Sequence, residues 1–179
     1  GAGYIEMALI THQHIGSDIV LENVKFHQTL SVKDCPIVRL ISDPDSQSFS
    51  IYSRSRTADS GWDKNASGKR LNLVFPTKPT QLDQSKILSR TPEQLNTREF
   101  YELLNDLGLE FGPHFITIQN ASVGEHEMLS ELEVNTSFGE SAIDYFVHPT
   151  LLDGAFQSLL ALAIKEIEKE GKIFIPFEI

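Results

Sequence analysis

The first 75 residues combine one helical pattern with several alternating ones. Apolar residues recur at helical spacing over 1–14, at Ile5, Ala8 and Leu9, with His12 on the same face. Strand-like stretches separated by turn clusters follow at 19–32, 36–41, 49–56 and 68–75. A helix followed by consecutive strands predicts an α+β unit in which the helix packs on an antiparallel sheet.

The pattern changes after residue 75. Three prolines and many polar residues predict a linker over 76–97. Thr97 is the expected N-cap of the next helix, and Gly108 its end. Strands are predicted within 115–134, and they are followed by a helix from Pro149 to about Lys169 and an apolar, strand-like tail. The predicted organisation is therefore a first unit over 1–75, a linker over 76–97 and a second unit over 98–179.

Charge and composition exclude several classes of function. The 179-residue chain carries a formal net charge of −10, which disfavours binding to nucleic acid or to anionic membranes. No apolar run approaches the roughly 20 residues of a membrane-spanning helix, and the first residues lack the pattern of a signal peptide. A single cysteine, Cys35, favours a reducing compartment. We therefore expect a cytoplasmic protein that binds neither nucleic acid nor membrane.

The stretch HPTLLDGAFQ, residues 148–157, places a carboxyl group on an apolar helix face. At 100° per residue, Asp153 and Gln157 lie on the same side as Phe156 and Leu160. Burial disfavours the charged form of a carboxyl group, so Asp153 could keep its proton and act as a general acid, with Gln157 one turn on to orient it.

A structural interpretation of the same residues is favoured over catalysis on these grounds alone. Thr150 and Asp153 match a capping box, in which the threonine is the N-cap and the carboxylate reaches back to its amide. If Pro149 is instead the first helical residue, Asp153 lies a full turn inside the helix and gains only from the helix dipole.

Other polar clusters fit structural roles better. His12 and His14 are two residues apart on a helix and point about 200° apart, so we expect no metal site. His148 precedes a proline and is expected to bond to the backbone rather than to act as a base. The sequence at Gly68 lacks the glycine spacing of a phosphate-binding loop. Gly112 and Pro113 predict a turn.

A family resemblance runs in order along the whole chain. HPTLLDGAFQ resembles the H-P-x-L-L-D-x-x-x-Q signature of dehydratase domains in modular polyketide synthases. Weaker similarities to the same family are found in GAGYIEMAL, VLENVKFHQTLSV, WDKNASGK, LEFGPHF and IPFEI. The resemblance implies a double hot dog fold, in which two long helices are each wrapped by an antiparallel sheet, with the second hot dog incomplete in this chain.

The resemblance also implies a reaction and its participants. The reaction is the loss of water from a β-hydroxyacyl thioester carried on the phosphopantetheine arm of an acyl carrier protein, with no metal or other cofactor bound by the domain. Asp153 matches the family's general acid and Gln157 its supporting residue. Five further residues are placed beside a substrate tunnel: Phe111, Gly112, Pro113, His148 and Pro149. The implied partners are the carrier protein, the neighbouring synthase domains and a second copy in a homodimer.

Departures from the family pattern define what to expect of the isolated chain. The family's catalytic histidine would fall upstream of Gly1, and none of the six histidines present occupies its position. We therefore expect this chain alone to be inactive. Phe111 stands where the family often has tyrosine, and retention of Asp153 favours dehydration over double-bond isomerisation. The rivals are a related cyclase or product-template domain and a catalytically silent hot dog used for dimerisation and domain docking.

Overall fold

A computed structural model of the chain describes residues 1–10, 18–33, 35–56, 61–73, 81–135, 145–171 and 177–179. These residues form two compact units. Unit 1 comprises 1–78 together with 176–179, and unit 2 comprises 79–175. None of the helices in the described ranges has the length and apolar character needed to cross a bilayer.

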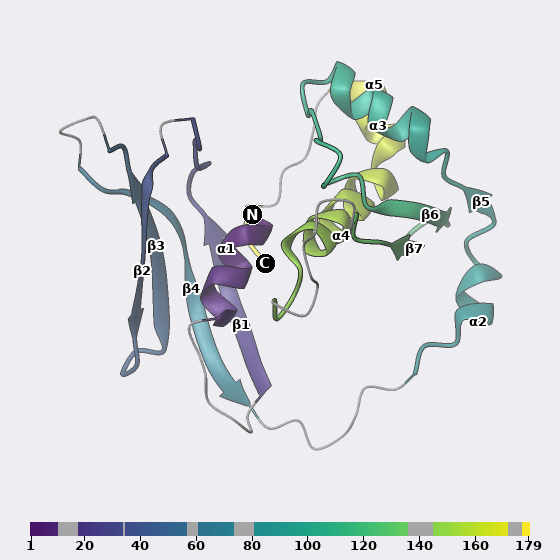
Figure 1. Cartoon of the computed structure of the whole chain (residues 1–179). Coiled ribbons are helices and arrows are strands. Elements are labelled where there is room, and N and C mark those ends of the chain that lie inside the picture. The colour runs from purple at the N-terminus through teal and green to yellow at the C-terminus, as the bar shows by residue number, and fades with distance from the viewer. Residues whose placement is uncertain (11–17, 34, 57–60, 74–80, 136–144, 172–176) are drawn as a thin grey trace. The chain divides into compact units, whose positions relative to one another are not determined.

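Unit 1 is a helix packed on an antiparallel sheet. Helix α1 (Ala2–Ile10) precedes the strands β1 (Asp18–Phe26), β2 (Ile37–Asp43), β3 (Ser48–Arg54) and β4 (Asp63–Leu73), which lie in the order β1-β4-β3-β2 (Figure 1). The core forms where apolar residues of α1 meet the inward-facing residues of the strands, and its buried members are Tyr4, Ala8, Val24, Phe49, Ile51 and Ala66. The predicted helix-on-sheet unit is confirmed. The remainder of the predicted helix, with His12 and His14, lies outside the described residues.

The edge strand β1 is shorter than predicted and has an unexpected neighbour. Its pairing with β4 shifts register after Glu22, where Asn23 has a φ of 52°, and the strand ends at Phe26. The amide of Val24 donates to the carbonyl of Ile179 at 2.7 Å, and the amide of Ile179 donates back at 3.0 Å. Residues 177–179, which the sequence assigned to the second unit, therefore belong to unit 1. The exposed donors and acceptors of an edge strand select this partner, and no local pattern in the tail reveals it.

Unit 2 combines a small antiparallel sheet with the long apolar helix. Its elements are α2 (Gln84–Leu88), β5 (Glu93–Gln94), α3 (Thr97–Asp106), β6 (Ile118–Val123), β7 (Met128–Leu132), α4 (Pro149–Leu162) and α5 (Ile164–Glu170), with the strands in the order β5-β6-β7 (Figure 1). Its buried core consists of Phe100, Leu104, Ile118, Ala121 and Ala161. The single helix predicted from Pro149 divides at Ala163, whose amide donates to the carbonyls of Leu159 at 3.2 Å and Leu160 at 3.1 Å.

The ends of α3 correct one prediction and confirm another. Asn96, not Thr97, is the N-cap, because its side-chain oxygen accepts the amide of Glu99 at 3.4 Å. Thr97 is the first helical residue. Gly108 follows the end of the helix with a φ of 88°, a conformation that side chains with a Cβ rarely adopt.

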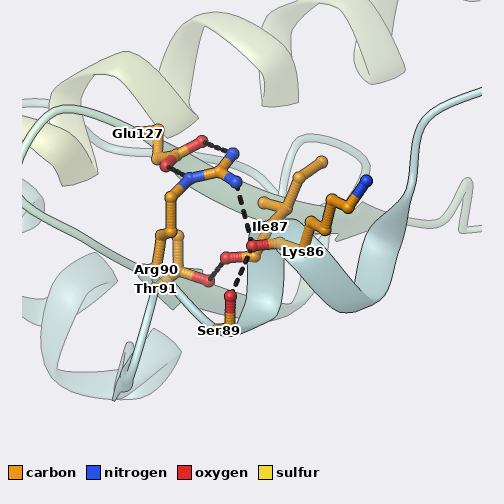
Figure 2. Close-up of polar contacts among 6 residues, drawn as sticks. All are labelled: Lys86, Ile87, Ser89, Arg90, Thr91 and Glu127. Carbon is orange, nitrogen blue, oxygen red and sulfur yellow. Dashed lines mark hydrogen bonds and ion pairs between the residues drawn. The ribbon is translucent and has the colours of Figure 1, made fainter.

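The range predicted as a linker is docked on unit 2 where it is described. It contains α2 and β5, and β5 pairs with β6. Arg90 forms a two-pronged ion pair with Glu127, the residue directly before β7, and also donates to the carbonyl of Lys86 at 3.0 Å (Figure 2). The hydroxyl of buried Thr91 donates to the carbonyl of Ile87 at 3.1 Å. The polar composition that predicted a linker reflects a surface segment held by such specific contacts.

Arg90→Met is expected to loosen the attachment of α2 and β5 to the rest of unit 2. The ion pair lowers the pKa of Glu127 in the folded chain. Its contribution to stability is therefore present above the pKa of Glu127 in the unfolded chain, and it is lost as the pH falls through the lower pKa of the folded chain. Because the pair is partly exposed, we expect amide hydrogen exchange in α2 and β5 to accelerate only roughly two- to fivefold at neutral pH. The difference from wild type should narrow as the pH falls below the ordinary glutamate pKa and disappear below the lowered pKa of folded Glu127.

Arg98→Met is the matched control, since it removes an exposed ion pair with Glu102 within α3. It should leave exchange in α2 and β5 unchanged. Equal exchange in wild type and Arg90→Met would show that the β5–β6 pairing alone holds the segment.

Candidate active site

The start of α4 determines where Asp153 lies. His148 is the N-cap, and its Nδ1 accepts the amide of Thr150 at 3.3 Å and pairs with the Thr150 hydroxyl at 2.8 Å. Pro149 is the first helical residue, as suits a residue without an amide proton. The capping-box interpretation of Thr150 and Asp153 is therefore wrong, because the helix begins two residues earlier and its first turn is capped by the imidazole. Asp153 lies a turn inside the helix.

Gly154 allows α4 to pack closely against the sheet. A Cβ at this position would lie 2.2 Å from Oγ1 of Thr117 and 3.3 Å from Cδ2 of Leu132, a side chain of β7. The Thr117 hydroxyl donates to the carbonyl of Thr150 at 3.4 Å, which ties the first turn of α4 to the segment before β6. The glycine beside Asp153 thus brings the start of α4 within reach of residues 115–118.

The carboxamide of Gln157 is buried and hydrogen-bonded at both its nitrogen and its oxygen. Its Nε2 donates to Oδ2 of Asp153 at 2.8 Å and to the carbonyl of Phe115 at 3.0 Å. Its Oε1 accepts the hydroxyl of Tyr101 at 2.8 Å. Only 2% of Gln157 is exposed, whereas Asp153 is half-buried and keeps an accessible side. The hydrogen bond from Gln157 holds one carboxyl oxygen of Asp153, and the Asp153 residue remains partly accessible to solvent.

Tyr101 enters the site from α3. Burial raises the pKa of its hydroxyl above the ordinary value, the amide of Ile118 opposes this as a donor at 3.4 Å, and the charge of Asp153 adds to the increase. The hydroxyl therefore stays protonated at neutral pH and serves as a donor. Its ring meets that of Phe111 edge-to-face, with centroids 6.0 Å apart. Position 111 itself contributes no hydroxyl.

The five residues predicted beside a tunnel have different environments. Phe111 and Pro149 are half-buried, His148 is buried, and Gly112 and Pro113 are exposed. The predicted turn is present, because the amide of Phe115 donates to the carbonyl of Gly112 at 2.8 Å. A groove of about 430 Å³ in unit 2 runs along β7 and α4 and is lined by none of these five residues. Their role in a tunnel stays a prediction.

Sequence reasoning missed three partners of the site. Tyr101, the carbonyl of Phe115 and the hydroxyl of Thr117 come from segments that are distant from α4 in the chain. The only local signal was a tyrosine at the edge of the α3 apolar stripe. Among the described residues, no group of three or more histidine, cysteine, aspartate or glutamate side chains could hold a metal ion.

Comparison with known proteins agrees with the resemblance in the sequence. A family model described as "Polyketide synthase dehydratase N-terminal domain" matches residues 79–179, more than half of the chain. Polyketide synthase GfsE from Streptomyces halstedii is 27% identical over 184 residues, which cover 99% of this chain and 5% of that protein. The chain thus spans only about a twentieth of this relative.

Solved structures match over the whole chain. A curacin CurJ dehydratase, solved as an inactive histidine-to-phenylalanine mutant with a bound compound, is 26% identical, with a TM-score of 0.86 over 100% of this chain and 63% of that one. A curacin CurK dehydratase, solved as an inactive aspartate-to-asparagine mutant, is 24% identical, with a TM-score of 0.85 over 100% and 66%. The predicted α+β hot dog fold is confirmed.

Proposed function

Because the chain belongs to the polyketide synthase dehydratase family, we propose that it contributes the acid half of a site that dehydrates a β-hydroxyacyl thioester during polyketide chain elongation. One observation carries this proposal: buried Gln157 donates to the half-buried carboxyl group of Asp153 at 2.8 Å. A fixed acid with an accessible side is what protonation of a leaving hydroxyl requires.

In the proposed step, a base removes the proton on the α-carbon of the thioester, and those electrons form the α,β double bond. The bond between the β-carbon and its hydroxyl oxygen breaks as Asp153 transfers its proton to that oxygen, and water leaves. The base ends with one proton and Asp153 without one, so a proton transfer between them restores the starting state. No oxidant, metal or nicotinamide takes part.

The base in this proposal is the histidine that the family pattern places before Gly1. His148 is not a candidate, because its Nδ1 caps α4 and it is 4% exposed. The mutants of the curacin dehydratases support this division of roles, since replacement of either a histidine or an aspartate accompanies inactivity in those proteins.

The remaining assignments extend the same proposal. The substrate would be carried on the phosphopantetheine of an acyl carrier protein, the domain itself would bind no cofactor, and Phe111, Gly112, Pro113, His148 and Pro149 would line its path. Neighbouring synthase domains and a second copy of the domain would be the other partners. A polyketide synthase of this kind would act in the cytoplasm.

Turnover by the full-length domain that contains this chain tests the proposal. A β-hydroxyacyl carrier protein is incubated with the domain. Mass spectrometry then follows the loss of about 18 mass units from the acyl chain, which corresponds to one molecule of water. Formation of the unsaturated thioester supports a dehydratase. A folded domain that leaves the substrate unchanged would favour the silent hot dog, and a cyclic product would favour the cyclase.

A further inference from the structure

The carboxamide of Gln157 has two possible orientations, which differ by a 180° flip. Only one of them turns its nitrogen toward Asp153. The two ends of the group have opposite hydrogen-bonding roles, since the nitrogen donates and the oxygen accepts. Three groups surround it: the carboxyl of Asp153, the carbonyl of Phe115 and the hydroxyl of Tyr101. The hydrogen bonds to these neighbours decide whether the nitrogen or the oxygen of the carboxamide faces the carboxyl group of Asp153.

We propose that Tyr101 is a positioning residue, whose hydroxyl fixes the carboxamide of Gln157 so that its nitrogen faces Asp153. This inference rests on the proposed dehydration and adds a residue outside HPTLLDGAFQ to its site. The hydroxyl of Tyr101 is hydrogen-bonded to Gln157 and to the amide of Ile118 rather than to Asp153, so Tyr101 acts through Gln157.

The donor and acceptor inventory supports this role. The Phe115 carbonyl and an ionised Asp153 carboxylate can only accept, so both require the NH2 end of Gln157. The Tyr101 hydroxyl is the only one of the three groups that can always donate to Oε1, and it does so at 2.8 Å. All three hydrogen bonds are satisfied together in this orientation. In the flipped orientation Oε1 would face the Phe115 carbonyl and, whenever Asp153 is ionised, a second acceptor, while Nε2 would face the Tyr101 hydroxyl. This is a costly arrangement for a group that is 2% exposed.

The tyrosine is itself held firmly enough to do this. It follows Phe100, which is 1% exposed in the core of unit 2, so its backbone lies on an anchored face of α3. Its ring packs against Phe111, and its hydroxyl oxygen accepts the amide of Ile118 at 3.4 Å. That accepted bond directs the hydroxyl proton away from Ile118 and leaves it for Gln157.

Tyr101→Phe in the full-length domain tests the proposal. The change removes one oxygen and keeps the ring, so we expect kcat for the β-hydroxyacyl carrier protein to fall about three- to tenfold, the equivalent of one hydrogen bond. KM should stay within about twofold, because the carboxamide of Gln157 is buried, with only 2% of the residue exposed. In a Gln157→Leu background the same change should have no further effect on kcat, since the group through which Tyr101 acts is gone.

Thr91→Val is the matched control for loss of a buried hydroxyl. Thr91 is 1% exposed and bonds the carbonyl of Ile87, far from Gln157 in the chain. It should lower thermal stability and leave kcat unchanged. If Tyr101→Phe changes kcat no more than Thr91→Val does, or lowers it equally in the Gln157→Leu background, the proposal is overturned.

Gln157→Glu keeps the proposal falsifiable if Tyr101→Phe does not fold. Glutamate keeps the shape and can still accept from Tyr101, but it presents an acceptor to Asp153 and to the Phe115 carbonyl. We expect kcat to fall at least as far as in Gln157→Leu, and wild-type kcat would overturn the proposal. Absence of dehydration by the wild-type domain is a different result, because it contradicts the proposed function before any variant is compared.

Discussion

Asp153→Asn in the full-length domain is expected to lower kcat for dehydration by about 10²- to 10⁴-fold, the range typical for loss of a general acid. Asparagine has nearly the same shape, and its side-chain oxygen can accept the Gln157 bond that now measures 2.8 Å. It cannot transfer a proton to the departing hydroxyl. Substrate binding should change little, so the loss should appear in kcat and kcat/KM alike.

The control is Asp106→Asn, the same chemical change at an exposed position near the end of α3. It should leave both turnover and thermal stability unchanged. Circular dichroism melts of the two variants separate loss of chemistry from loss of structure. Full turnover by a folded Asp153→Asn domain would remove Asp153 from the mechanism and leave it a structural residue of α4.

Gly154→Ala is expected to lower the free energy of unfolding by about 1–3 kcal/mol, the usual cost of overpacking a close contact. The added Cβ would lie 2.2 Å from Oγ1 of Thr117, so α4 or the segment before β6 must move. This cost has to exceed the roughly 0.5–1 kcal/mol that alanine gains over glycine inside a helix. Because Asp153 precedes the glycine, movement of α4 should also lower kcat. Chemical denaturation and turnover measure the two effects.

Two variants make this test specific. Gly3→Ala places the same change in α1, where nothing lies within 4 Å of the new Cβ, and it should stabilise the domain slightly. Thr117→Ala removes the oxygen that clashes, so it should recover part of the stability lost in Gly154→Ala. Gly154→Ala that is as stable as Gly3→Ala would show that α4 and β6 do not depend on close contact.

Periodicity predicted the apolar faces but could not predict the exact helix ends. Thr97 and Thr150 both looked like N-caps, yet Asn96 and His148 hold those positions. Caps are decided by which side chain reaches a free amide, and neighbouring polar residues compete for this within a single turn. For Asp153 the difference matters, because a start at Pro149 removes the capping box and leaves the carboxyl group free for another role.

Composition misjudged residues 81–97 for a related reason. Prolines and polar side chains describe how a segment meets water, and α2 and β5 are indeed mostly exposed. Their attachment depends on Arg90 finding Glu127, 37 residues later, and on β5 pairing with β6. Such long-range pairs leave no periodic trace in either partner.

The sequence by itself determined the helix-and-sheet composition of both units, the family, and the placing of Asp153 and Gln157 one turn apart, because these follow from local spacing and from a contiguous motif. Tertiary structure alone decided what surrounds that pair. Tyr101 from α3, the Phe115 carbonyl and the close approach at Gly154 converge only when α3, β6 and α4 pack together. Hydrogen-bond partners of a buried carboxamide are chosen by proximity in space, and a local pattern carries no record of that choice.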